Sequence, residues 1–375
     1  MHVLHLHSSF EPGGKELRAV RLINAFGKGA RHTIVSAVPE ALGAGHLIDK
    51  KIDVAYPRDF PSLVGKPWPG RLQKIALAMK PFDLILTYNW GAMDAVLAYS
   101  IFGGHHGLPP LVHHEDGFNE DEADGLKPRR NWFRRVALAK VPALVVPSQR
   151  LKEIALEVWQ QPHARVHQIG NGIDLAAFAK PPKPTAVRRL VKRRNERWVG
   201  TLAGLRQVKN LPALVRAFAA LSEPWQLVIL GEGPEREAIR KEAERLDLLD
   251  RVHLPGFIDD PSKVVALFDI FALSSHSEQM PISLVEAMAA SVPVASPDVG
   301  DVAAMLSAEN REIVVPAGDE DALAKVLVRL AGDEALRRQL GEANRARAER
   351  SFDEDKMIAA YRALYARAVD QESFP

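Results

Sequence analysis

Short β-rich runs alternate with longer helical patterns along almost the whole chain of 375 residues. This alternation is typical of strand–helix units around parallel sheets, because two parallel strands need a long crossover connection, usually a helix. The expected strands occupy residues 2–6, 32–36, 51–55, 83–87, 111–114, 143–147 and 165–169 in the first half, and 198–202, 226–230, 252–254, 270–274, 292–295 and 312–315 in the second. The pattern therefore predicts two successive α/β domains.

The two halves are separated by a stretch rich in proline and basic residues, at 180–194. We interpret it as a linker. The expected domains cover residues 1–180 and 181–355, followed by a helix within 356–375. Two open parallel sheets in tandem should leave a cleft at the carboxyl ends of their strands, where such sheets bind ligands. Functional residues are therefore sought on loops that follow strands.

Composition excludes several classes of protein. The 49 Lys and Arg residues nearly balance 47 Asp and Glu, for a formal charge of +2, and no nucleic-acid-binding motif occurs. The absence of cysteine excludes disulfides, thiolate nucleophiles and Cys-ligated metal. No signal-peptide pattern and no run of about 18 apolar residues occur. We expect a cytoplasmic protein.

The strongest candidate site follows the strand expected to end near residue 274. Pro281 suits the first position of a helix, so the free amides of Ile282 and Ser283 would form an anion site that fits a diphosphate. Glu286 lies about one turn further along, where its carboxylate could bind a ribose diol. Alternatively, Glu278 and Glu286 merely favour the amino-terminal part of a helix.

Two further segments carry candidate phosphate ligands. In 199–210, Arg206 and Lys209 lie where a strand gives way to a helix, and both could neutralise phosphates. A solvated helix start is the alternative. Gly13 and Gly14 follow the first strand and permit close approach of backbone to a ligand, but they do not complete a G-x-G-x-x-G motif. The glycines at 231 and 233 are interpreted as turns.

A fourth segment, 111–118, contains two histidines and two acidic residues at a strand end. Neighbouring strand residues face opposite sides, so His113 and His114 are not expected to share a metal ion. Proton transfer or hydrogen bonding to a sugar by His114 or Asp116 is one reading, and a buried strand end is the other. The basic and aromatic segment 127–135 could lie on an anionic membrane or form a solvated face.

Taken together, these segments resemble the family 4 retaining glycosyltransferases, which have the two-domain GT-B fold. Residues 268–294 resemble the family's E-x7-E block, with Glu278 and Glu286 as its two acidic residues. The segments 12–14, 169–174, 199–210, 231–234 and 254–257 follow the family's order. The resemblance covers nearly the whole chain and implies a final helix that crosses back to the N-terminal domain.

The resemblance implies transfer of a sugar from a nucleotide-diphosphate donor to an acceptor, by front-face attack with retention of configuration. It implies no divalent metal and no cofactor besides the donor substrate. Glu286 would bind the ribose, and Glu278 would hold the donor sugar. The other implied donor-binding groups are Lys209 and Arg206 at the leaving diphosphate, the backbone of Gln279, Met280 and Ile282 at the sugar, and Gly13 and Gly14 near the phosphates.

The chain departs from the family pattern at two places. The family's arginine in a Gly-Arg-Leu setting is replaced by Gly204-Leu205, and Arg206 stands later. The family's histidine before glycine is replaced by Asp116, so either Asp116 or one of His113 and His114 makes the sugar contact. The candidate catalytic residues are accordingly Asp116, His114, Lys209 and Glu278.

The expected activity is construction of a surface glycan or exopolysaccharide. The expected acceptor is a lipid-linked or growing glycan, and the protein is expected in the cytoplasm or peripherally on the inner face of the plasma membrane. Two alternatives stay open. One is a nucleotide-sugar epimerase of the same fold, which would turn over donor without an acceptor alcohol. The other is a nucleotide-sugar-binding protein without turnover.

Overall fold

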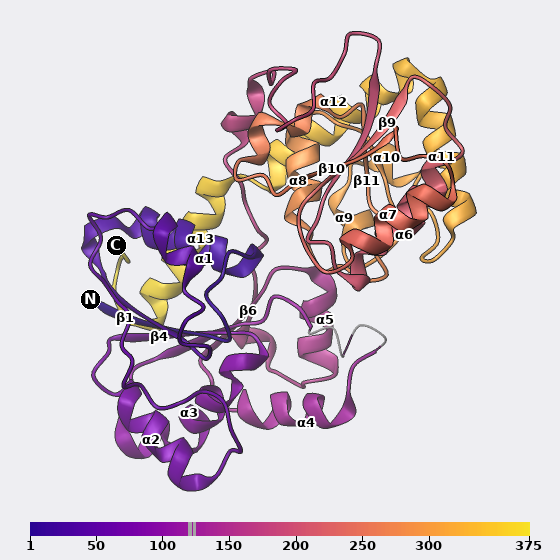
Figure 1. The fold of residues 1–375 in the computed structure, drawn as a ribbon. Helices are drawn as coiled ribbons and strands as arrows, with labels where there is room; N and C mark the ends of the chain where they lie inside the picture. Colours follow the sequence, from indigo (N-terminus) through magenta and orange to yellow (C-terminus); the bar gives the residue numbers. More distant parts are fainter. Residues whose placement is uncertain (119–121, 123–124) are drawn as a thin grey trace. The chain divides into compact units, whose positions relative to one another are not determined.

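The computed structural model describes residues 1–118, 122 and 125–375. It divides into two units, the first formed by Met1–Asn171 with Lys356–Pro375 and the second by Gly172–Asp355 (Figure 1). Each unit contains one sheet of parallel strands, as the alternation of strand and helix patterns predicts.

Seven parallel strands form the sheet of the first unit, in the order β3-β2-β1-β4-β5-β6-β7. They are β1 His2–His7, β2 Arg31–Ser36, β3 Val54–Ala55, β4 Leu84–Tyr88, β5 Leu111–His114, β6 Ala143–Val146 and β7 Val166–Gln168. The chain proceeds outward from β1 to β3 and then returns to place β4 beside β1. The topological switch point, where such sheets bind ligands, therefore lies at the carboxyl ends of β1 and β4.

Helices cover both faces of this sheet. They are α1 Gly14–Phe26, α2 Pro69–Met79, α3 Met93–His106, α4 Pro128–Ala137, α5 Gln149–Glu157 and α13 Glu354–Ala368. In Figure 1, α1 and α13 lie on one side of β1 and β4, and α2 and α3 lie on the other. Alternate strand residues enter opposite cores, with Val3 on the α1 side and Leu4 and Leu6 on the other.

The C-terminal helix α13 packs into the first unit, as the resemblance implies. Its Tyr361 and Tyr365 are fully buried in the same core as α1. The Tyr365 hydroxyl lies 2.8 Å from Nε2 of His114 on β5. The last residues of the chain therefore complete the unit that the first residues begin.

Five parallel strands form the second sheet, in the order β10-β9-β8-β11-β12. They are β8 Arg197–Leu202, β9 Trp225–Leu230, β10 Val252–Gly256, β11 Ile270–Ala272 and β12 Val294–Ala295. Its helices are α6 Leu211–Phe218, α7 Arg236–Arg245, α8 Ile282–Ala289, α9 Val302–Met305, α10 Ala308–Arg311, α11 Glu320–Gly332 and α12 Glu334–Ser351. The switch point lies at the carboxyl ends of β8 and β11.

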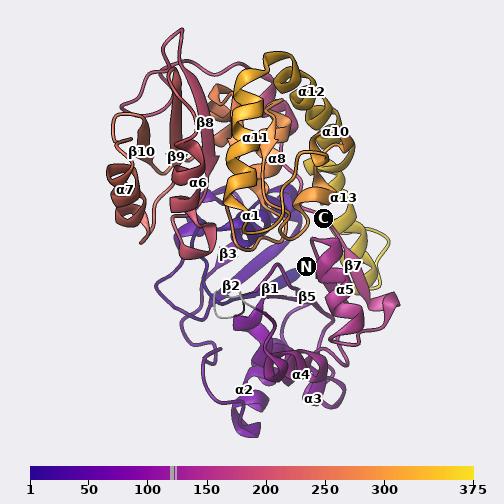
Figure 2. The ribbon, with the colours of Figure 1, turned by 90° about the vertical axis from the view of Figure 1, so that its right-hand side faces the viewer.

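Two cores sandwich the second sheet. Residues of α6, α7 and α11 form one, and residues of α8 and α9 form the other. Helices α6 and α11 lie side by side (Figure 2). Both faces are covered, so strands such as Trp225–Leu230 are buried along their whole length.

Two expectations differ from the structure. Residues 312–315 form no strand, because only Val315 pairs, through one bridge to Pro297. The stretch at 180–194 is not a linker between units, because the first unit already ends at Asn171. Val187, in that stretch, is 1% exposed and packs in the core of the second unit. The proline and arginine content of this segment resembles that of a linker, but the buried Val187 anchors the segment in the core.

Among the residues that the structure describes, no helix is both long and apolar enough to cross a membrane.

The packing around β8 generates a stability prediction. A side chain at Gly200 would collide with the ring of Phe268, which is buried in the same unit. Gly200→Ala should lower the free energy of unfolding by about 1–3 kcal/mol because of overpacking, measured by urea denaturation. Gly332→Ala is the control, because nothing lies within 4 Å of its added methyl group. Equal stability of both variants would contradict this packing.

Candidate functional site

Two loops at the switch point of the second sheet are bound to each other by backbone and side-chain hydrogen bonds. One follows β8 and the other follows β11. The His276 amide donates to the Val208 carbonyl at 2.9 Å, and the Ser274 hydroxyl donates to the Lys209 carbonyl at 3.0 Å. These bonds fix the position of Lys209 relative to the loop that leads into α8.

Lys209 and Glu278 form an ion pair that also connects the loops after β8 and β11. Nζ of Lys209 lies 2.5 Å from Oε1 of Glu278, and the Ser275 hydroxyl donates to the same oxygen at 2.7 Å. The side chains are 16% and 7% exposed. Both residues were predicted to belong to one site, and in the structure they are in direct contact. An ammonium group is thereby held beside the start of α8.

The start of α8 offers unpaired backbone donors. Pro281 is the residue that caps the helix, one position before the place expected for it, and Ile282 is the first helical residue. Within the described chain, the amides of Gln279 and Ile282 donate no hydrogen bond. Oε1 of Gln279 is buried and also lacks a partner. Together these groups can bind an anion and a neighbouring hydroxyl.

Glu286 lies on α8, one turn beyond this start, and is 9% exposed. Its neighbours along the helix, from Leu284 to Ala289, are buried as well. Met280 also packs in the core, so its side chain anchors the loop while its backbone remains part of the site. A nearly buried carboxylate at this position suits hydrogen bonds to ligand hydroxyls.

Three glycines allow the loops of the site to pack closely. A side chain at Gly231 would collide with the Ala203 carbonyl, and one at Gly233 would collide with the Leu205 carbonyl. A side chain at Gly300, where φ is +59°, would collide with the Glu278 carbonyl. Gly231 and Gly233, with φ of 147° and 154°, lie in the loop after β9 and support the loop after β8.

Arg206 precedes the short 3₁₀ turn Gln207–Lys209 and is exposed. Its side chain makes no hydrogen bond or ion pair with any residue that the structure describes. Its guanidinium is therefore available to a phosphate in solution, whereas Lys209 is held in place.

In the first unit, Asp116 belongs to a buried ion pair. The Arg18 guanidinium on α1 binds both carboxylate oxygens, one of them at 2.9 Å, and also donates to Oδ1 of Asn171 at 3.2 Å. Burial opposes ionisation of Asp116, but the adjacent Arg18 charge holds its pKa below the usual value. The Asp116 side chain remains 13% exposed. Its amide donates to the Asn89 side chain at 2.7 Å.

His113 and His114 face opposite sides of the sheet, as expected for adjacent strand residues, and both are buried. Nδ1 of His113 lies 2.8 Å from the Thr87 hydroxyl, whereas His114 contacts Tyr365. Burial lowers the pKa of His114 to about 3, so its imidazole is neutral at pH 7. These contacts indicate that His114 is a buried structural residue at the end of the strand rather than a group that transfers protons. Of the three candidates, Asp116 alone keeps some exposure.

Gly13 caps α1 and Gly14 begins it, directly after β1. A methyl group at Gly13 would lie 2.8 Å from Oε2 of Glu16. Glu16 is 4% exposed, and burial raises its pKa. A carboxylate of the protein therefore already lies at the start of this helix, where an anionic ligand was expected.

Arg18 and Gly300 belong to these sites but were not predicted from the sequence. Arg18 interrupts the apolar residues on the buried face of α1, and this interruption is its only signal in the sequence. Gly300 lies outside every motif that was considered. Among residues 1–118, 122 and 125–375, no three His, Asp or Glu side chains are grouped to hold a metal ion.

Two family profiles match successive parts of the chain. The profile described as Glycosyltransferase Family 4 matches residues 3–177, and that described as Glycosyl transferases group 1 matches residues 182–347. Among curated proteins, the chain is 26% identical over 207 residues to the N-acetyl-alpha-D-glucosaminyl L-malate synthase of Bacillus anthracis, covering 55% of this chain and 54% of that protein. It is 30% identical over 159 residues to the lipopolysaccharide core biosynthesis glycosyltransferase LpsE of Rhizobium meliloti, covering 42% of this chain and 46% of that protein.

These alignments span about half the length of either relative. Among solved structures, Anabaena HepE in complex with UDP superposes with a TM-score of 0.78 over 98% of this chain and 100% of that one, at 19% identity. That likeness shows the fold, two Rossmann-like units of the GT-B class.

The Arg18–Asp116 pair generates a pH-dependent prediction. Asp116→Asn leaves a buried cation without its carboxylate and should lower the free energy of unfolding at pH 7 by about 3–5 kcal/mol. Because the folded pKa is depressed, this stabilisation is present above about pH 4, the pKa of an unfolded aspartate, and is lost as the pH falls through the lower folded value. Urea denaturation across this pH range measures the difference.

Asp53→Asn is the matched control. Asp53 pairs with Arg31 at 3.3 Å, but both side chains are more than half exposed, at 68% and 56%. Its loss should cost about 1 kcal/mol or less. Similar, pH-independent losses in both variants would contradict a buried Arg18–Asp116 pair.

Proposed function

The chain belongs to glycosyltransferase family 4, and from this premise we propose that it transfers a sugar from a nucleoside-diphosphate sugar to an acceptor alcohol with retention of configuration. One observation carries the proposal: Lys209, Glu278, Glu286 and the start of α8 all lie at the switch point of one sheet. That set provides a cation and free amides for a diphosphate and carboxylates for hydroxyl groups.

In the proposed reaction the acceptor oxygen bonds to the anomeric carbon of the sugar as the bond between that carbon and the diphosphate breaks. Negative charge develops on the leaving diphosphate, which takes up the proton of the acceptor hydroxyl. Lys209 and the amides of Gln279 and Ile282 stabilise that charge, with the exposed Arg206 as a second cation. Because these groups supply the positive charge, the proposed transfer is independent of a metal ion and needs no cofactor. Glu278 orients the donor sugar, and Glu286 binds the ribose.

The donor is proposed to be a nucleotide-activated hexose or a related sugar. The HepE structures were determined with UDP, with UDP and glucose, and with UDP-glucose, which supports a uridine nucleotide among the first donors to test. The N-acetylglucosaminyl transfer named for the Bacillus anthracis relative supports the same sugar class.

The acceptor is proposed to be a lipid-linked or growing surface glycan. Similar proteins include two lipopolysaccharide core glycosyltransferases of Rhizobium meliloti, which supports this class. Such an acceptor would place the enzyme peripherally on the inner face of the plasma membrane. The first unit would then bind the acceptor and the second unit the donor.

A second candidate is a nucleotide-sugar-binding protein without turnover. The observation in its favour is that Arg18 occupies both carboxylate oxygens of Asp116, the residue at the family's histidine position. Release of nucleoside diphosphate from a panel of nucleotide sugars, with and without a membrane-lipid extract, separates the candidates. Extract-dependent release supports transfer, whereas release without acceptor indicates an epimerase or hydrolase. Donor binding with no release under any condition supports the binding protein.

The role of Glu286 generates a binding prediction. Glu286→Ala removes a charge-assisted acceptor of ribose hydroxyl groups and should weaken nucleotide binding by about 1–3 kcal/mol. Isothermal titration with the preferred nucleoside diphosphate measures the change. Glu237→Ala, on the exposed face of α7, is the control and should leave affinity unchanged. Unchanged affinity in Glu286→Ala would remove this residue from the site.

The role of Lys209 generates a kinetic prediction. Its charge matters most as the sugar–phosphate bond breaks, so Lys209→Ala should lower kcat more than it raises KM for the donor. Steady-state kinetics test this, with the exposed Lys241→Ala as control. A rise in KM with kcat intact would show that Lys209 contributes only to ground-state binding.

A further inference from the structure

A pocket of about 770 Å³ lies at the switch point of the first sheet. Ser8 follows β1, Ala37 follows β2, and Trp90 follows β4, and all three line it. Residues of α4 form another part of the wall. The volume is ordinary for a small-molecule site, and ligands of open parallel sheets bind at this position. No donor-site residue assigned above belongs to it.

The walls of this pocket are apolar and open to solvent. Val38, Val64 and Trp132 line it although they are 52%, 65% and 64% exposed. Trp68, next to the lining residue Pro67, is 66% exposed. Single exposed apolar side chains are common, but several around one pocket mark a site for an apolar ligand.

Most charged side chains that line the pocket are ion-paired with other residues of the protein, but Arg129 remains available to bind an anion. Asp94 is neutralised by Arg71 at 2.5 Å. Arg130 pairs with Glu122 at 3.0 Å, and its guanidinium lies 4.8 Å from the ring centre of Trp90. Arg129 is exposed and makes no ion pair with any residue that the structure describes. An apolar ligand that carries an anionic group is therefore complementary to this pocket.

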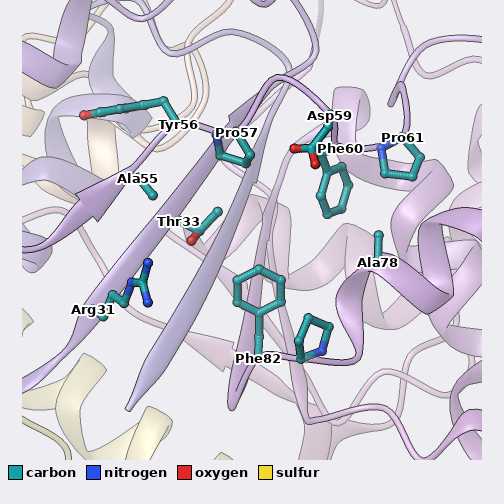
Figure 3. A pocket seen from close by; sticks show the side chains of 11 residues that line it. Arg31, Thr33, Ala55, Tyr56, Pro57, Asp59, Phe60, Pro61, Ala78 and Phe82 are labelled. Atoms are coloured by element: carbon teal, nitrogen blue, oxygen red, sulfur yellow. The ribbon is translucent and has the colours of Figure 1, made fainter.

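A second pocket of the same unit presents a carboxylate instead of an available cation. It has about 460 Å³ and lies by β2 and β3, where Arg31, Asp59 and Phe60 are among its lining residues (Figure 3). Arg31 pairs with Asp53 at 3.3 Å, whereas Asp59 has no charged partner among the described residues. A carboxylate remains there, which disfavours an anion. Of these two pockets, the one beside α4 combines apolar walls with a cation that has no ion-pair partner among the described residues.

We propose that the pocket beside α4 binds the apolar chain and the phosphate or diphosphate of a lipid-linked glycan acceptor. The chain contacts Val38, Val64 and Trp132, and the phosphate pairs with Arg129. This inference rests on the proposed glycosyl transfer and specifies its acceptor: a glycan on a phosphorylated lipid carrier rather than a free oligosaccharide. The accepting hydroxyl belongs to the glycan, which is attached at the phosphate end of such a ligand.

Farnesyl phosphate is a soluble probe of this chemistry, and isothermal titration measures its binding to the full chain. Trp132→Ala should weaken binding about tenfold, because truncation of a central aromatic contact typically costs this much. Arg129→Ala should weaken it about fivefold through loss of a charge-assisted contact. Arg135→Ala is the matched control, an exposed arginine on the same helix outside the pocket. All three side chains are exposed, and thermal melts verify that the variants fold.

Farnesol and inorganic phosphate should each bind more weakly than farnesyl phosphate, because each provides half of the complementary chemistry. Absence of farnesyl phosphate binding, or equal affinity in the wild type, Trp132→Ala and Arg129→Ala, overturns the inference. Binding of the nucleoside diphosphate is measured in parallel. If the nucleotide binds and farnesyl phosphate does not, the lipid acceptor fails while glycosyl transfer stands. If farnesyl phosphate binds at this pocket and no nucleotide binds, the proposed function fails instead.

Discussion

The ion pair and hydrogen bonds between the loops after β8 and β11 determine the geometry of the proposed donor site. The two strands are neighbours in the sheet, although the 67 residues 203–269 lie between the end of β8 at Leu202 and the start of β11 at Ile270. The Lys209–Glu278 ion pair and the two hydrogen bonds beside it connect these loops. Without this connection, the position of the Lys209 ammonium group would not be fixed relative to the start of α8. The catalytic proposal depends on their being held together.

In the first unit, too, an ion pair connects segments that are far apart in the sequence, but here it occupies a candidate catalytic residue. Arg18 on α1 reaches the strand end at Asp116 and binds its carboxylate on both oxygens. This ion pair takes the place where the family has a histidine followed by glycine. The acidic residue is therefore a poor candidate for proton transfer while Arg18 holds it. It is better suited to orient the loop that follows β5 and to accept a single hydrogen bond through its exposed edge.

Much of the fold follows from periodicity, because strands that are buried on both faces leave a clear apolar signal. The predicted strand at 111–114 coincides with β5, and the switch points follow from the order of the strands. The pair of Glu278 with Glu286 was recognisable because their spacing is local. Arg18 was not, since its partner lies 98 residues away and only the folded sheet brings them together. The buried contact of His114 with Tyr365 spans 251 residues and was equally inaccessible to pattern analysis.

The central claim is that a nucleoside diphosphate binds at the switch point of the second sheet. Backbone amide hydrogen exchange of the full chain, with and without the nucleoside diphosphate that most raises its Tm, tests this claim directly. We predict slower exchange in residues 204–210 and 278–284, the two connected loops and the start of α8. Protection confined to other segments, with these two unchanged, would contradict the account.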